Sequence, residues 1–164
     1  MRKENKNGFT LVEGLVAIAI LVLVITFVLN VIQGSLKPLA HSQAQIVASF
    51  LAQETIETVR NIRDENFLKG RNWLYGLDEC IVGVCRISIF SYPRVDLCTD
   101  GTCGKLRYDT ETGRYGYESE WIESEFTRET EIDENPYFGR ATVSVTVRWS
   151  TGELIMKETL YEFQ

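Results

Sequence analysis

Residues 8–32 read GFTLVEGLVAIAILVLVITFVLNVI, and this stretch decides how the chain is organised. Counted from Phe9 it is 24 residues long, and Glu13 is its only charged residue. A helix of that length measures about 36 Å, enough to cross a bilayer core of about 30 Å. A buried core helix is the alternative, but such helices seldom run this long without a polar face. The stretch therefore predicts a single transmembrane helix within residues 9–36.

The flanks of this apolar segment predict its orientation. Residues 1–8, MRKENKNG, carry three basic side chains against one acidic side chain. Short basic flanks stay in the cytoplasm, so we expect the rest of the chain outside it. A secretory signal peptide would place a small-residue cleavage site after the apolar run. The sequence NVIQGSLKPLA offers no clean site of that kind, and the conspicuous junction is Gly8–Phe9, before the run.

The motif GFTLVE at residues 8–13, with its short basic leader and long apolar helix, resembles the N-terminus of type IV pilins and type II secretion pseudopilins. The resemblance implies that a prepilin peptidase removes residues 1–8 by cutting between Gly8 and Phe9, and that the new Phe9 amine is N-methylated. It also implies that Glu13 is the buried glutamate of that family. Gly14 stands where the family commonly has Leu. This departure is compatible with cleavage but weakens the local helix by up to about 1 kcal/mol relative to Ala.

The chemistry of Glu13 agrees with a role in assembly. A carboxylate in hydrocarbon is costly and normally has a partner. Cleavage would create an α-amine on Phe9, which is cationic below its reference pKa of about 8. A neighbouring helix shifted by one turn would present that amine to Glu13, and the neutralised pair would set the axial register of assembly. The simpler alternative is a carboxylate that snorkels to the membrane edge.

Charge and composition limit the possible functions. The chain has 17 Lys and Arg against 23 Asp and Glu, a formal charge of −6, which becomes −8 when the leader with its three basic residues and one acidic residue is removed. An acidic chain repels nucleic acid, although Arg86, Arg94, Lys105 and Arg107 leave a local basic patch open. The single histidine, His41, is expected on the surface. With no phosphate-binding, calcium-loop or triad motif, the sequence predicts no catalysis, cofactor or metal.

A second helical segment is predicted at about residues 39–66, after a bend or restart at Pro38. Its apolar positions recur with a period of 3.6, and a stripe of that width requires a sheet against it. Ile46 and Phe50 fall on another side, where they cover the flank of the sheet or contact neighbouring subunits. The stripe consists of Ala44, Val47, Ala48, Leu51, Thr55, Val59 and Ile62.

The pattern changes to a period of two in the β-rich part, residues 80–163. Residues 140–150, RATVSVTVRWS, alternate apolar and polar side chains, which predicts a strand buried on one face. A turn at 150–153 and a partner strand at 154–163 complete a hairpin. Earlier strands are predicted at 81–90, 105–109, 114–118 and 121–130, with turns at 110–113 and 135–139.

Four cysteines form two C-x4-C pairs, Cys80 with Cys85 and Cys98 with Cys103. A two-residue turn inside each pair would place its members opposite one another in a hairpin, near disulfide geometry. Disulfides suit the expected compartment. Four cysteines allow three pairing schemes, and we favour the scheme in which both disulfides are local, Cys80 with Cys85 and Cys98 with Cys103. The nested pairing of Cys80 with Cys103 and Cys85 with Cys98 competes with it, and a four-thiolate zinc site is a weaker alternative.

An acidic stretch, ESEWIESEFTRETEIDE at residues 118–134, admits two interpretations. Paired carboxylates could bind a cation or act as acid and base. The alternation of Glu123 and Glu125 with Ile122 and Phe126 instead favours a strand with a solvated acidic face.

Together these features predict an α+β, type IV pilin-like fold. A long N-terminal helix, half transmembrane and half amphipathic, would pack on an antiparallel sheet in an extracytoplasmic headpiece at residues 39–164. QETIETVRNIRD at 53–64 and VSVTVRW at 143–149 resemble segments of PilV-like or I-type minor pilins. The resemblance implies a structural subunit of a type IV pilus, or fimbrium, rather than an enzyme, with a role in assembly initiation, at the tip, in adhesion or in DNA uptake.

The partners that this resemblance implies are the prepilin peptidase and N-methyltransferase, other pilin subunits and the inner-membrane assembly platform. The precursor would lie in the cytoplasmic membrane with its headpiece outside, and the assembled subunit in a pilus at the cell surface. A minor pseudopilin of type II secretion is the near alternative. A membrane-anchored extracellular binding module that never assembles is the alternative from a different class.

Overall fold

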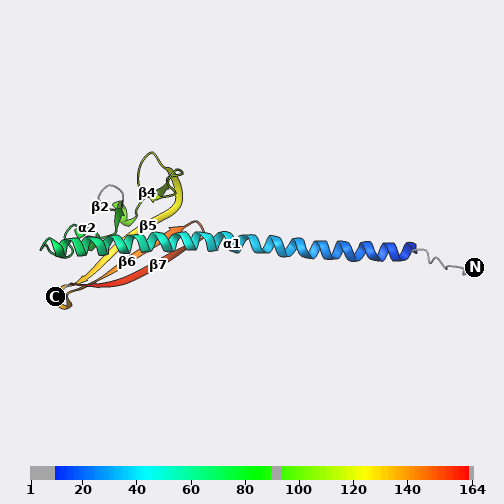
Figure 1. Cartoon of the computed structure of the whole chain (residues 1–164), viewed down its shortest axis with the longest axis horizontal. Coiled ribbons are helices and arrows are strands. Elements are labelled where there is room, and N and C mark those ends of the chain that lie inside the picture. Colours follow the sequence, from blue (N-terminus) through cyan, green and yellow to red (C-terminus); the bar gives the residue numbers. More distant parts are fainter. Residues whose placement is uncertain (1–9, 90–93, 163–164) are drawn as a thin grey trace, which may run out of the picture. The chain divides into compact units, whose positions relative to one another are not determined.

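The computed structural model describes residues 10–89 and 94–162, apart from the side chains of 33–40 and 100. The predicted cleavage junction Gly8–Phe9 lies outside these residues. Helix α1 (Leu11–Leu68) covers both predicted helical segments and includes position 38, where the sequence predicts a bend or a restart (Figure 1). The chain divides into two compact units, which we call the N-terminal unit (1–40) and the sheet unit (41–164).

The sheet unit contains an antiparallel sheet of seven strands among its described residues. β5 (Ile122–Asn135) is its centre, with β6 (Arg140–Trp149) along one edge and β7 (Gly152–Tyr161) beyond β6. The other edge of β5 pairs with β1 and β3, which in turn pair with β2 and β4. The short elements are α2 (Asp78–Val82), β1 (Cys85–Ser88), β2 (Arg94–Leu97), η1 (Thr99–Gly101), β3 (Lys105–Tyr108), β4 (Tyr115–Gly116) and η2 (Pro136–Phe138).

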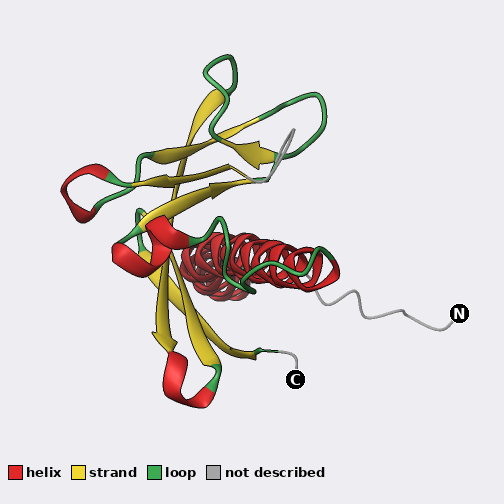
Figure 2. Ribbon diagram, turned by 90° about the vertical axis from the view of Figure 1, so that its left-hand side faces the viewer, coloured by secondary structure: helices red, strands yellow, loops and turns green. Residues whose placement is uncertain are grey.

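The part of α1 in the sheet unit lies against one face of the sheet, as the view along the helix shows (Figure 2). Its predicted apolar stripe is largely buried, and Ala52 and Ile56 are buried beside it, so the packed face is wider than the sequence predicts. The opposing side chains come mainly from β6, where apolar residues alternate with polar ones. The predicted α+β architecture, a long helix with an antiparallel sheet, is confirmed.

The predicted C-terminal hairpin is confirmed as β6 and β7, which pair without a register shift from Arg140–Tyr161 to Trp149–Gly152. Every second residue of β6 faces the core, and Ala141, Val143 and Val145 are fully buried. At the far end of β6, Gly139 closes the turn after η2 with a φ of 55°, in the left-handed region that favours glycine.

The largest differences from the predicted strands occur at three of them. The strand predicted at 81–90 begins instead as α2, whose turn is closed by hydrogen bonds from Cys80 N–H to Leu77 O (3.0 Å) and from Gly83 N–H to Glu79 O (3.2 Å). The strand predicted at 114–118 is only two residues long. β5 extends beyond 130 to Asn135, because each of its residues from 127 onward pairs with β6. This pairing keeps the acidic residues extended against their weak strand propensity.

Candidate anchor and assembly site

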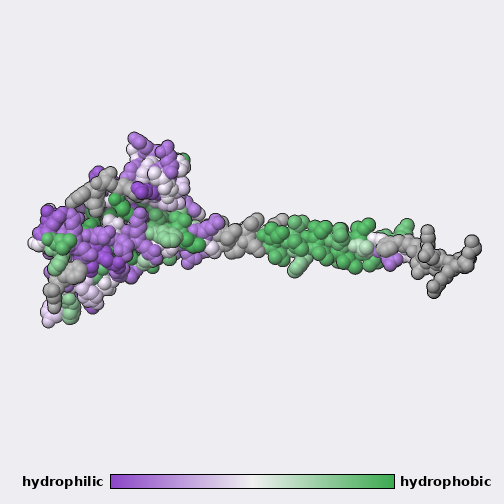
Figure 3. Space-filling view, viewed as in Figure 1, coloured by the Kyte–Doolittle hydropathy of each residue, from purple (hydrophilic) through white to green (hydrophobic). Residues whose placement is uncertain are grey.

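The candidate anchor is the apolar segment of α1. Leu11–Ile32 form 22 helical residues, and the most apolar stretch of 18 residues within them has a mean hydropathy of 3.1 and is 0% buried within the described residues. Figure 3 shows it as an almost unbroken hydrophobic surface. Its length and composition suffice to cross a membrane. Because the described part of the chain does not cover this surface, its burial there requires a bilayer or other helices.

Two polar residues inside the anchor each donate a side-chain hydrogen bond to the backbone of the helix. Thr26 Oγ1 donates to the carbonyl of Val22 at 2.8 Å, and Asn30 Nδ2 donates to the carbonyl of Thr26 at 2.9 Å. An unsatisfied polar group in hydrocarbon costs several kcal/mol. These local bonds therefore make Thr26 and Asn30 compatible with insertion.

Thr10 caps the start of α1. The backbone N–H of Glu13 donates to Thr10 Oγ1 at 3.3 Å, which satisfies one of the free amides of the first turn. Thr10 and Glu13 have the Thr-x-x-Glu spacing of a capping box, a signal within GFTLVE that our sequence analysis missed. An acidic side chain in the first turn also suits the positive end of the helix. Thr10 and Glu13 thus mark the start of the helix within the predicted cleavage motif.

The Glu13 side chain is exposed, and its carboxylate has no hydrogen bond or ion pair within the described residues. Its predicted partner, the Phe9 amine, lies outside those residues, as does Gly8, so the cleavage and pairing roles stay predictions. Gly14 has no atom within 4 Å of the place where a Cβ would lie. Packing within one chain therefore does not explain a glycine at this position.

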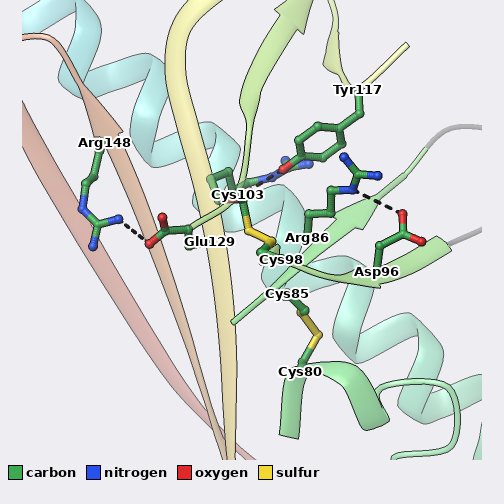
Figure 4. Close-up of a disulfide and its surroundings, with 10 residues drawn as sticks. Cys80, Cys85, Arg86, Asp96, Cys98, Cys103, Tyr117, Glu129 and Arg148 are labelled. Atoms are coloured by element: carbon green, nitrogen blue, oxygen red, sulfur yellow. Dashed lines mark hydrogen bonds and ion pairs between the residues drawn. A yellow bond between two sulfur atoms is a disulfide. The ribbon is translucent and has the colours of Figure 1, made fainter. Parts of the chain in front are cut away.

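The first disulfide joins Cys80 of α2 to Cys85 at the start of β1 (Figure 4). The two Cα atoms are 4.9 Å apart, and both side chains are fully buried. This is the local pairing that the sequence favours, but the hairpin expected around it is wrong. The short helix α2 and the extended Gly83 bring the two cysteines together instead.

The second disulfide joins Cys98 to Cys103, with Cα atoms 5.0 Å apart. The two-residue turn expected at 100–101 is present, closed by a hydrogen bond from Thr102 N–H to Thr99 O at 3.2 Å within η1, and Gly101 adopts a φ of 69°. The expected hairpin is wrong, because the flanking strands β2 and β3 pair with β1 and β5 rather than with each other. The N–H of Cys98 donates to the Val84 carbonyl at 2.9 Å, so the two disulfide loops are adjacent. All four cysteines are in disulfides, which leaves no thiolate for the zinc alternative.

A buried arginine is the main residue that the sequence analysis missed. Arg128 on β5 is 1% exposed, and its guanidinium donates to Glu54 Oε2 at 3.1 Å and to the carbonyls of Leu51 (3.4 Å) and Ile87 (3.0 Å). It thereby joins α1, β1 and β5. The sequence did contain a signal for this position. Residues two apart in a strand point to the same face, so Arg128 shares the inward face of β5 with Phe126.

The neighbouring Tyr117 stacks on this cluster. Its hydroxyl donates to the Arg128 carbonyl at 3.2 Å, and the Arg86 guanidinium lies 5.3 Å from its ring centroid (Figure 4). Burial raises the pKa of the Tyr117 phenol, while the charge of Arg128 opposes that shift. The arrangement is that of a structural support between the disulfide loops and the sheet.

The acidic stretch is only partly a solvated face. Glu123 and Glu125 are exposed as predicted, whereas Ile122, expected on the apolar face, is exposed too. Glu129 is 8% exposed and forms an ion pair with Arg148. Among the described residues, no three or more His, Cys, Asp or Glu side chains group as metal ligands.

The four side chains of the basic patch that the sequence left open hydrogen-bond within the sheet unit. Two carboxylates serve three of these cations, and Arg107 bonds to neutral carbonyls, so the patch keeps a net positive charge. The partners are Asp96 for Arg86 (3.2 Å) and Arg94 (3.0 Å), Glu123 for Lys105 (2.9 Å), and the carbonyls of Ser119 and Trp121 for Arg107 (2.9 and 3.1 Å).

Ile46 and Phe50 are exposed on α1, at 56% and 65%. Phe50 borders a groove of about 530 Å³ between α1 and residues 113–115. Both side chains are more than half exposed, which leaves surface for contact with a neighbouring subunit, and Phe50 also borders the flank of the sheet at Tyr115 of β4.

Comparison with known proteins bears on the N-terminal unit. Residues 3–29 match the prokaryotic N-terminal methylation motif, a span that contains Gly8, Phe9 and Glu13. Comparison with curated proteins and with solved structures finds no match. The chain thus carries the prepilin-type methylation motif on an apolar helix, followed by a disulfide-bonded sheet unit, in an α+β architecture of the type IV pilin kind.

Proposed function

We propose that this chain is a minor pilin-like structural subunit of a type IV pilus, of the PilV-like or I-type kind. The observation that carries the proposal is the match of residues 3–29 to the N-terminal methylation motif, at the start of an apolar helix that the chain itself leaves uncovered. A membrane holds this helix in the precursor, and neighbouring helices cover it in the filament. No catalytic step by this chain is part of the mechanism.

Processing prepares the helix for assembly. The prepilin peptidase cuts between Gly8 and Phe9 and methylates the new amine. The Glu13 backbone is held by the Thr10 cap, while its carboxylate lacks a partner among the described residues. In the filament this carboxylate neutralises the Phe9 amine of a neighbouring subunit, which sets the axial register.

The decisive measurement is the N-terminal mass of the protein extracted from membranes. A mature chain beginning at N-methylated Phe9 supports the proposal. Retention of residues 1–8 in every molecule would remove its foundation and would favour the membrane-anchored binding module that does not assemble.

The role of Glu13 gives a separate prediction. Glu13→Gln keeps the shape of the side chain and removes its charge, so we expect normal cleavage and normal amounts of membrane-bound protein but little incorporation into filaments. Immunoblots of membrane and sheared-filament fractions measure both. Glu120→Gln, on an exposed residue of the sheet unit, is the matched control. Equal incorporation of the two variants would defeat the register mechanism.

A minor pseudopilin of type II secretion shares the same motif and stays the second candidate. Deletion of the gene separates the two. Loss of surface filaments with intact protein secretion supports the pilus, and loss of secretion with intact filaments supports the pseudopilin.

A further inference from the structure

β7 forms a long, regular edge of the sheet. It pairs with β6 over ten residues, from Gly152 to Tyr161, and no other strand among the described residues pairs with it. The strand contains no proline and no bulge, two of the devices that blunt such an edge, and of the charged side chains that are a third device it carries Glu153, Lys157 and Glu158. A regular unpaired edge presents a row of backbone donors and acceptors to another extended chain.

The turn geometry identifies which backbone groups face outward. A two-residue turn at 150–151 closes the hairpin, so that Trp149 and Gly152 form a hydrogen-bonded pair. The N–H of Glu162 also donates across to Gly139 O, at 2.8 Å. Even-numbered residues therefore bond to β6, and the odd-numbered residues from Glu153 to Tyr161 direct their N–H and C=O groups away from it.

The odd-numbered side chains of β7 form a defined pattern on the exposed face. Ile155 is 54% exposed and Tyr161 is 59% exposed. Lys157 lies opposite Ser144 and has no carboxylate partner among the described residues. An added antiparallel strand would gain from an apolar side chain beside Ile155 and from a carboxylate beside Lys157, because directly opposed side chains interact.

We propose that the outer edge of β7 is a docking site for an extended segment of a different protein, which joins the sheet antiparallel to β7 with an apolar residue beside Ile155 and an acidic residue beside Lys157. Backbone hydrogen bonds supply the attraction, and the alternate side chains supply the register. The inference uses membrane anchoring but does not depend on assembly into a filament.

The direction of β7 favours a different protein over a second copy. At the start of the sheet unit, His41 Nδ1 lies 3.3 Å from Oγ1 of Thr151, the residue just before β7. Further along α1, Arg60 forms an ion pair with Glu158 of β7. β7 therefore runs in the direction of α1. Two antiparallel β7 strands would place the His41 ends of the two chains at opposite ends of the pair. Chains that rise from one membrane begin their sheet units on the same side.

The test uses the full-length chain in detergent micelles and the peptide acetyl-TVTKEVVVK-amide, whose residues complement Tyr161 to Glu153 in antiparallel order. We expect peptide binding to slow hydrogen exchange at the backbone amides of Ile155, Lys157 and Thr159. The amides of Leu154 and Met156, which already bond to β6, should not change.

Two control peptides separate strand addition from other binding. N-methylation of the third, fifth and seventh peptide residues, whose amides face β7, should weaken binding at least about tenfold, because backbone hydrogen bonds are lost. N-methylation of the fourth, sixth and eighth residues, whose amides face outward, should not. Lys157→Glu should weaken binding of this peptide and strengthen binding of its charge-reversed form.

Three results would overturn the proposal. The first is that both N-methylated peptides bind as tightly as the unmodified peptide. The second is that the unmodified peptide binds without slowing hydrogen exchange at the odd-numbered amides of β7. The third is that hydrogen exchange at those amides is already slow without peptide and becomes slower as the protein concentration rises. That result would assign the edge to a second copy.

Discussion

Arg128 shows how a buried charge can hold three elements in place. Its side chain is 1% exposed, yet Glu54, its carboxylate partner, is 39% exposed. The ion pair is therefore half solvated, and the carbonyls of Leu51 and Ile87 supply the buried acceptors. One hydrogen-bonding position, Nε, has no partner within the described residues, so the cluster is stabilised by fewer bonds than the guanidinium could make.

Replacing this arginine tests that account. Arg128→Met keeps an apolar stem but leaves the Leu51 and Ile87 carbonyls without their donors, so we expect the free energy of unfolding to fall by about 2 to 3 kcal/mol. Arg94→Met is the control, because the Arg94 side chain is 75% exposed and such pairs contribute about 0 to 1 kcal/mol. Urea unfolding in micelles measures both variants, and equal losses would contradict the buried role of Arg128.

Gly152 is required by a close approach rather than by its φ angle. A Cβ at this position would lie 2.9 Å from the Trp149 ring and 3.3 Å from His41. Because Trp149 is 8% exposed and part of the core, Gly152→Ala should cost about 1 to 3 kcal/mol of unfolding free energy through overpacking. Gly104→Ala meets no atom within 4 Å and should be tolerated. A Gly104→Ala variant as unstable as Gly152→Ala would argue against this contact.

Among the elements, the C-terminal hairpin follows from local information and α2 does not. The alternation in β6 and the turn residues after Trp149 are visible in the sequence, and burial on one face enforces them. Ile81 and Val82 favour strand, yet they belong to α2, whose turn is closed by the Leu77 and Glu79 carbonyls. The extension of β5 depends on its pairing with β6. The residue pattern of β5 alone gives no information about that pairing.

The anchor and its start could be read directly from GFTLVE and the apolar run, because both signals are local. The inward position of Arg128 could be read from its parity with Phe126, but its carboxylate partner could not, because Glu54 lies 74 residues away in the sequence. The partners of the basic patch could not be read from the sequence for the same reason. Its acceptors, such as Asp96 on the neighbouring strand, come from elements whose register the sequence does not reveal.

The two disulfides allow an internal comparison. Both close loops with a sequence separation of 5, so the chain-entropy contribution of each is about 2 kcal/mol. Cys80 and Cys85 are fully buried, whereas Cys103 is 7% exposed and Cys98 more so. We expect the double Ala variant at 80 and 85 to lose more unfolding free energy than that at 98 and 103. Equal losses would mean that burial of the first disulfide contributes nothing.

For the whole molecule, division into two units predicts that processing leaves the sheet unit unaffected. All three tryptophans, Trp73, Trp121 and Trp149, lie in that unit, so their fluorescence reports its unfolding alone. An uncleaved precursor and the mature chain should unfold at the same urea concentration in micelles. A shift between them would show that the leader or the N-terminal unit stabilises the sheet unit.

The shortness of the two disulfide loops has a mechanical consequence. Neither covalent link joins α1 to the sheet, and neither spans more than a few residues. A pulling force applied between the anchor and β7 would therefore be borne by packing and hydrogen bonds alone, with Arg128 among the contacts that resist it. Under sufficient tension nearly the entire sheet unit can be drawn out into extended chain, since the disulfides withhold only their own short loops from extension.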